Sequence, residues 1–224
     1  MPRSTQEHRP FTIVVGVIRE ALRYSNRDSV IIAGGGPEAA LLERWLEAAG
    51  IPFELPTQEF LEKTTEWLHE AAGAQPSLGI RPSRRHLDQD ASELAARALA
   101  FAHHEESLLL GTANKTHLLL GYGPAHPPIL PLGDLYASQI LELAEGCTLP
   151  APLIGMATEE ISAVDSALRA YFEDGRSANE AFRGLEPGRA RQIRQMLQES
   201  SRLWHPLPLI PKLGEATLGL DLDL

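Results

Sequence analysis

Apolar positions along the chain follow two patterns, short continuous runs and helical spacing. Three runs are apolar almost throughout and predict buried strands: 30–34, 51–55 and 107–111. Segments with apolar residues every three or four positions predict helices between and after these strands: 38–49, 57–72, 88–104 and 114–121. The alternation of strand and helix predicts an α/β fold with a doubly wound parallel sheet.

The pattern of residues 11–25, FTIVVGVIREALRYS, fits two elements. Its β-branched run favours a strand, whereas the later spacing of Ile18, Leu22 and Tyr24 favours a helix. We prefer the helix.

The second half of the chain predicts helices that no strand interrupts. A helix at 134–145 would begin at Asp134 as N-cap, and further helices follow near 157–173, 177–183 and 188–203. The proline-rich end predicts an extended tail over the surface. We therefore expect one domain, 1–224, made of three parts: an α/β core at 11–145, a helical part at 146–204 and the extended tail at 205–224.

Composition and charge restrict the partners. The chain has 224 residues, of which 43% are hydrophobic, enough for a substantial core. Its 30 acidic and 20 basic residues give a net charge of −10, which opposes attraction to nucleic acid and to anionic membranes. The single cysteine, Cys147, excludes a disulfide within the chain, and the sequence contains neither a long apolar run nor a signal-peptide pattern. We expect a cytoplasmic protein without a nucleic-acid or membrane partner.

The stretch 31–42, IIAGGGPEAALL, has the pattern of a phosphate-binding loop. A strand, a glycine turn and a helix start would present free backbone N–H groups and the positive end of a helix dipole to an anion. However, Pro37 removes one of these donors and Glu38 already supplies a negative charge.

Two clusters of side chains could bind ligands, and each has a simpler interpretation. One is a set of histidines that could hold a transition metal: His103, His104, His117 and His126. Adjacent histidines on a helix point about 100° apart, so we prefer a solvated helix end. The other is a basic group that could receive phosphate: Arg81, Arg84, Arg85 and His86. We prefer a solvated loop, 73–86, for this group.

Residues 111–144, GTANKTHLLLGYGPAHPPILPLGDLYASQILELA, resemble the NAD synthase family of the N-type ATP pyrophosphatase superfamily. The resemblance covers 11–145 and, more weakly, the helical remainder. These residues stand in the family's order: Gly111, Thr112, Asn114, Lys115, Gly121, Tyr122, Pro131, Gly133, Asp134, Leu135, Tyr136 and Gln139.

The resemblance implies a Rossmann-like fold of the adenine-nucleotide α-hydrolase type in a homodimer. It implies that ATP, with magnesium, adenylates the carboxylate of nicotinate adenine dinucleotide and that ammonia then displaces AMP to give NAD. It places the nucleotide loop at Ala33, Gly34, Gly35, Gly36, Pro37 and Glu38. It places substrate contacts at Gly111, Thr112, Asn114, Lys115, Tyr122 and Asp134. From the residues themselves, Tyr122, Asp134 and Tyr136 fit a role in keeping the fold.

Several family positions carry other residues here. The loop's two serines correspond to Ala33 and Glu38, and its metal-binding aspartate corresponds to Pro37. The second metal-binding position is His117, where a hard cation would require oxygen, and a phosphate-facing lysine is Ala137. We therefore assign no catalytic residue and no metal ligand.

Three functions remain open. The first is an NAD synthase-like protein with a degenerate ATP and magnesium site, acting as a dimeric binding or regulatory protein. The second is a functional ammonia-dependent NAD synthase with substituted ligands. The third is another nucleotide-handling enzyme with histidine chemistry at His117 and His126. Apolar residues of 114–122 and 134–145 would form the dimer interface: Leu118, Leu119, Leu120, Ile140, Leu141 and Leu143.

Overall fold

The structure of the protein is a computed structural model that describes residues 5–55, 102, 106–121, 129–144, 156, 158–200 and 210–213. Several predictions fall outside these residues: the helix at 57–72, most of the helix at 88–104, and the loop at 73–86 with its basic group. The same holds for Tyr122, His103, His104, His126 and Cys147.

A parallel sheet forms the centre of the fold. It contains β1 (Val30–Ala33), β2 (Phe53–Glu54) and β3 (Leu108–Gly111) in the order β2-β1-β3. Both neighbours are parallel to β1, and a parallel bridge from Leu110 to Ile129 continues the sheet beyond β3. The predicted fold class is confirmed. The chain leaves β1 on one side for β2 and returns on the other side for β3, so the topological switch point lies between β1 and β3.

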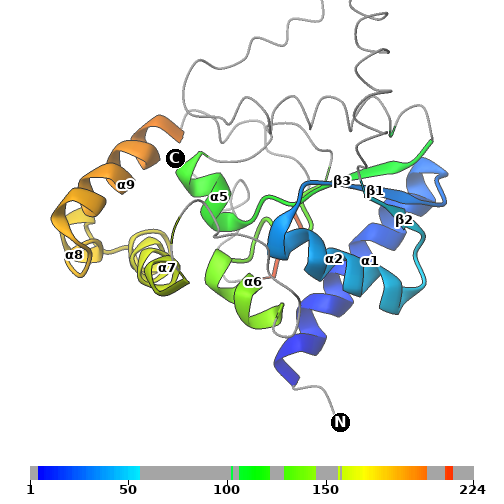
Figure 1. The fold of residues 1–224 in the computed structure, drawn as a ribbon, viewed down its shortest axis with the longest axis horizontal. Helices are drawn as coiled ribbons and strands as arrows, with labels where there is room; N and C mark the ends of the chain where they lie inside the picture. Colours follow the sequence, from blue (N-terminus) through cyan, green and yellow to red (C-terminus); the bar gives the residue numbers. More distant parts are fainter. Residues whose placement is uncertain are drawn as a thin grey trace, which may run out of the picture.

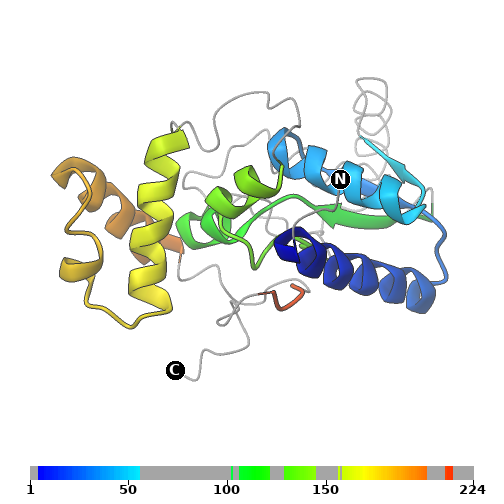
Figure 2. The same ribbon diagram turned by 90° about the horizontal axis from the view of Figure 1, so that it is seen from below.

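Two helices cover one face of this sheet: α1 (Thr5–Ser25) and α2 (Gly36–Ala49). Their apolar sides pack on Val30 and Ile32 of β1, and Phe11 meets Trp45 edge-on at 6.2 Å between ring centroids. Figure 2 shows the two helices side by side. The helix preferred for 11–25 is confirmed, and it begins earlier, at Thr5.

The opposite face of the sheet is also apolar. Ile31, Ala33 and Leu109 point to that side and pack with Ala102. Because both faces of these strands are buried, the continuous apolar runs correctly predicted buried parallel strands.

The other described helices form a second apolar cluster beside the sheet (Figure 1). They are α5 (Lys115–Leu120), α6 (Ala137–Leu143), α7 (Thr158–Phe172), α8 (Ala178–Ala181) and α9 (Pro187–Ser200). The short helix α6 lies between the two clusters, because Ile140 belongs to the sheet core and Ala137 to the helical cluster.

The predicted start of α6 was wrong. Tyr136, not Asp134, is the N-cap residue, and its backbone N–H donates to the side chain of Gln139 at 2.9 Å. Asp134 does not cap this helix because its carboxylate accepts a hydrogen bond from the backbone N–H of Leu213.

The tail prediction was also wrong in part. Residues 210–213 are not helical, as expected, but Ile210 and Pro211 are buried rather than spread over the surface. The reason is the apolar contact of Ile210 with Ala113 and Leu130. Within the described part of the chain, every helix is too short or too polar to cross a membrane.

Candidate functional site

The loops after β1 and β3 meet at the switch point. The hydroxyl of Thr112 donates to the carbonyl of Ala33 at 3.5 Å, joining the ends of the two strands. Gly34 has φ +150, and a Cβ at this position would lie 1.9 Å from Thr112 Oγ1. Glycine is therefore required here by the approach of Thr112 as well as by its backbone conformation.

The α2 helix begins directly after this contact. Its N-cap, Gly35, has no side chain to cap the helix, Gly36 has a left-handed φ of 77°, and Pro37 stands in the first turn. Glu38, also in the first turn, is only 3% exposed. Its carboxylate accepts a hydrogen bond from its own backbone N–H, and Oε2 would be 3.2 Å from a Cβ at Gly36. The carboxylate therefore turns back to the start of its own helix, where a bound anion would lie.

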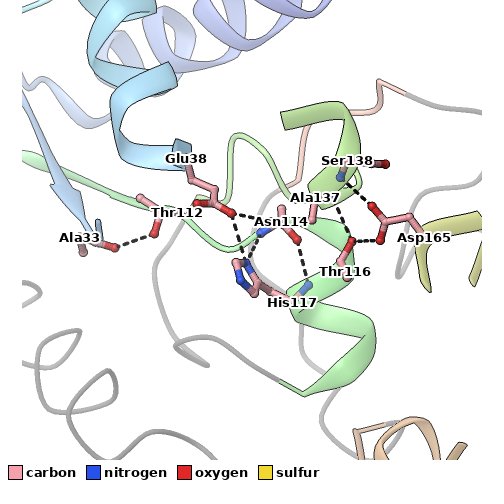
Figure 3. Close-up of polar contacts among 9 residues, drawn as sticks. All are labelled: Ala33, Glu38, Thr112, Asn114, Thr116, His117, Ala137, Ser138 and Asp165. Carbon is pink, nitrogen blue, oxygen red and sulfur yellow. Dashed lines mark hydrogen bonds and ion pairs between the residues drawn. The ribbon is translucent and has the colours of Figure 1, made fainter. Parts of the chain in front are cut away.

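Asn114 connects this carboxylate to α5, as Figure 3 shows. Its Nδ2 donates to Glu38 Oε1 at 2.7 Å, and its Oδ1 accepts from the backbone N–H of His117 at 2.9 Å as the N-cap of α5. The backbone N–H of Asn114 points to His117 Nδ1 at 3.4 Å, and this nitrogen lies 3.8 Å from Glu38 Oε1. These three residues bridge the two loops of the switch point.

Burial shifts the pKa values of both titratable members of this group. It raises the pKa of Glu38 to about 7, although hydrogen bonds from its own backbone and from Asn114 act in the opposite direction. It lowers the pKa of His117 to about 4. Near neutral pH, His117 is therefore an uncharged acceptor and Glu38 is partly protonated.

These residues do not fit Mg²⁺, the ion that the family resemblance implies. Pro37 has no oxygen in its side chain, and His117 offers nitrogen to a cation that prefers oxygen. The Glu38 oxygen nearest His117 already accepts from Asn114. Within the described residues, no group of three or more His, Cys, Asp or Glu side chains could hold a metal.

Lys115, a predicted substrate contact, is 2% exposed and belongs to a buried charge cluster. Its Nζ lies 2.8 Å from Glu173 Oε1, 3.5 Å from Asp134 Oδ1 and 4.9 Å from the centre of the Tyr136 ring. The hydroxyl of Tyr136 donates to the same Glu173 oxygen at 3.0 Å. Asp134 and Tyr136 therefore both contact Lys115 within this buried cluster.

A second carboxylate lies at the start of α6. Asp165 accepts from the Thr116 hydroxyl at 2.6 Å and from the Ser138 backbone N–H at 2.7 Å (Figure 3). Thr116 in turn accepts from the backbone N–H of Ala137 at 2.9 Å. Burial raises the pKa of Asp165, and these hydrogen bonds oppose the rise.

The structure thus brings most of the predicted residues to the switch point. Ala33 and Gly111 end the strands there, and Gly34 follows Ala33. Across the switch point, Thr112 donates to the carbonyl of Ala33 and Asn114 donates to Glu38. Sequence reasoning missed Asp165 and Glu173 in and after α7. The available signal for Asp165 was a carboxylate on the apolar side of a helix, between the buried residues Val164 and Leu168.

Known proteins are similar to this chain over nearly its whole length. No family model matches it. The NH3-dependent NAD+ synthetases of Chlorobaculum tepidum and Chlorobaculum parvum are 26% and 27% identical to it, over 93% and 94% of this chain and 91% of each relative.

Two solved structures share its fold. The NH3-dependent NAD synthetase of Campylobacter jejuni gives a TM-score of 0.57 at 16% identity, covering 95% of this chain and 99% of that one. The NMN synthetase of Francisella tularensis gives 0.56 at 18%, covering 96% and 99%.

The parallel sheet and its two switch-point loops therefore have the Rossmann-like fold of the adenine-nucleotide α-hydrolase type. The resemblance to the NAD synthase family that residues 111–144 carry is confirmed by these relatives.

Proposed function

We propose that this chain is an NAD synthase-like protein whose ATP and magnesium site no longer supports the family reaction. That reaction is the ATP-dependent amidation of nicotinate adenine dinucleotide to NAD. The observation that carries the proposal is the carboxylate of Glu38, which lies at the start of α2 and is held there by Asn114.

Electrostatics supports this proposal. Two unit negative charges 4 Å apart repel by about 4 kcal/mol at an effective dielectric constant of 20. A pyrophosphate at the α2 N-terminus would lie at about such a distance from the Glu38 carboxylate. It would also receive no backbone hydrogen bond from Pro37, which has no N–H. The repulsion by Glu38 and the missing N–H of Pro37 both weaken the stabilisation of a departing pyrophosphate.

The start of α6 supports the same conclusion. Asp165 supplies the anion that accepts from Ser138 and Thr116, and Ala137 offers no amine to a phosphate. Two helix starts on the candidate site are therefore filled by carboxylates of the chain itself.

The alternative is a functional ammonia-dependent NAD synthase with substituted ligands. The raised pKa of Glu38 favours it, because a neutral carboxyl would not repel phosphate below pH 7. A third candidate is a dimeric nucleotide-binding or regulatory protein that binds nicotinate adenine dinucleotide or another adenine nucleotide without turnover.

An assay with nicotinate adenine dinucleotide, ATP, Mg²⁺ and ammonia separates these functions. We expect no NAD formation above background at pH 6 or pH 8, and no rise in thermal stability with ATP and Mg²⁺. A nucleotide at a hundred times its Kd would add about 2.7 kcal/mol. Magnesium-dependent AMP release coupled to NAD formation would establish the functional synthase, and stabilisation by a nucleotide without turnover would establish the binding protein.

Restoring the family residues is the complementary experiment. The triple change Ala33→Ser, Pro37→Asp and Glu38→Ser should restore some ATP affinity but little turnover. Turnover should require the further changes His117→Glu and Ala137→Lys, because they add charge at the same centre. The two further changes alone, in the unmodified loop, are the matched control and should restore neither property.

We also propose a homodimer. Of the six apolar residues expected at its interface, three are buried within one chain: Leu119, Leu120 and Ile140. The other three are partly buried: Leu118, Leu141 and Leu143. The surface available for a partner is therefore smaller than the sequence suggested. Light scattering at micromolar concentration should give twice the chain mass of 24.5 kDa, and the chain mass itself would contradict the proposal.

A further inference from the structure

Residues 210–213 lie far along the chain from the loop 129–136, yet they contact it through apolar and polar groups. We propose that residues 210–213 are an intramolecular strap, which docks on Gly133 and Asp134 and thereby holds this loop against α5. The strap is drawn in red in Figure 2. This proposal does not depend on which ligand the candidate site binds.

The apolar part of the contact is centred on Ile210. This side chain is 7% exposed and packs with Ala113 and Leu130, with Leu118 at the margin. A Cβ at Gly133 would lie 3.1, 3.1 and 3.2 Å from Ile210 Cγ1, Cγ2 and Cδ1. Gly133 has no left-handed φ, so the approach of Ile210, rather than the backbone, explains the glycine.

The polar part of the contact is one hydrogen bond. The backbone N–H of Leu213 donates to Asp134 Oδ2 at 2.6 Å, and the Asp134 side chain is completely buried. The side chain of Leu213 also packs, partly buried, against the sheet core. A backbone donor and two apolar side chains thus fix four consecutive residues of the strap.

Asp134 transmits this contact to the candidate site. Its Oδ1 lies 3.5 Å from Lys115 Nζ, and the backbone N–H of Lys115 donates to the carbonyl of Leu135 at 2.8 Å. Lys115 directly follows Asn114, whose side chain holds Glu38. The strap therefore stabilises the loop that positions the first turn of α5.

A double-mutant cycle tests the apolar contact. We expect Gly133→Ala to lower the urea midpoint of unfolding in the natural chain, because the new methyl group meets Ile210. In the Ile210→Ala background the three contacting atoms are absent, so the same change should have little effect. Equal effects of Gly133→Ala in both backgrounds would overturn the proposal.

Two variants of one residue test the polar contact and its effect on the site. Leu213→Pro removes the N–H and the side chain, whereas Leu213→Ala keeps the N–H. We expect amides 113–118 to exchange several-fold faster with solvent deuterium in Leu213→Pro than in Leu213→Ala, while α9 amides remain unchanged. Equal exchange at 113–118 in the two variants, or faster exchange confined to residues near 213, would overturn the proposal.

Discussion

The side-chain amide of Asn114 donates a 2.7 Å hydrogen bond to the carboxyl group of Glu38 across the switch point of the sheet. Both side chains are buried, Asn114 completely and Glu38 to within 3%. The bond joins the loop after β1 to the loop after β3, the two segments between which a ligand of an α/β sheet binds.

Replacing Asn114 should destabilise the fold in two separable ways. Asn114→Ala removes the cap of α5, which contributes about 1 kcal/mol, and leaves the Glu38 acceptor buried without this donor, at about 1–3 kcal/mol. Asn114→Ser keeps a capping oxygen and removes the amide N–H that donates to Glu38. Urea denaturation should rank the three chains as natural, Ser and Ala in decreasing stability. Equal stability of the natural and Ser chains would show that the bond to Glu38 contributes nothing.

Glu38 and His117 should affect the pH dependence of stability with opposite sign. The folded-state pKa of Glu38 rises from 4.5 to about 7, so its contribution to stability is complete below pH 4.5 and is lost as the pH rises to 7. The folded-state pKa of His117 falls from 6.5 to about 4, so its contribution is complete above pH 6.5 and is lost as the pH falls to 4. Each change corresponds to about 3 kcal/mol, and the two largely cancel between pH 4.5 and 6.5.

Single substitutions should separate these two effects. Relative to the natural chain, Glu38→Gln should gain stability as the pH rises from 4.5 to 7, because the loss from Glu38 is gone. His117→Gln should show the reverse, a relative loss as the pH rises from 4 to 6.5. Denaturation curves of all three chains at matched pH values provide the measurement. Parallel pH profiles for all three would contradict the assigned pKa changes.

Gly34 and Gly35 should differ sharply in how well they tolerate substitution by alanine. Gly34→Ala places a Cβ 1.9 Å from Thr112 Oγ1 at φ +150, and we expect it to cost more than about 4 kcal/mol or to prevent folding. Gly35→Ala is the matched control, because Gly35 has an extended φ of −139 and nothing within 4 Å of the new Cβ. Expression and thermal unfolding should give a natural-like protein only for Gly35→Ala.

Asp165 should stabilise the starts of two helices at once. Asp165→Ala removes the acceptor of Ser138 N–H and of the Thr116 hydroxyl, at a cost of about 2–4 kcal/mol. Thr116→Val removes the hydroxyl and should cost less. The double variant should be less destabilised than the two single effects predict together, since both remove the same hydrogen bond. Strict additivity would show that the two groups act independently.

Sequence reasoning reached the fold because its signals were local. The continuous apolar runs at β1 and β3 and the helical spacing of apolar residues in α2 each act within a few residues. The start of α6 failed for the opposite reason. Asp134 has the residue type of an N-cap, but its carboxylate is used by Leu213, 79 residues away.

The candidate site shows the same division. Family positions placed Glu38, Asn114 and His117 near one another, and their loops do meet. Sequence could not reveal that Asn114 holds Glu38, or that Lys115 pairs with Glu173. Both contacts depend on side-chain directions across elements separated by more than 50 residues.

The short helix α6 has a consequence for how the molecule melts. Its seven residues supply Ile140 to the apolar core of the sheet and Ala137 to the apolar cluster of the helices. Unfolding of either cluster would therefore expose apolar side chains of the other to solvent. Ser200 of α9 adds a hydrogen bond to the Leu119 carbonyl, tying the last described helix to α5. Heating should therefore produce one calorimetric transition, with equal calorimetric and van't Hoff enthalpies, instead of stepwise loss of the helical part.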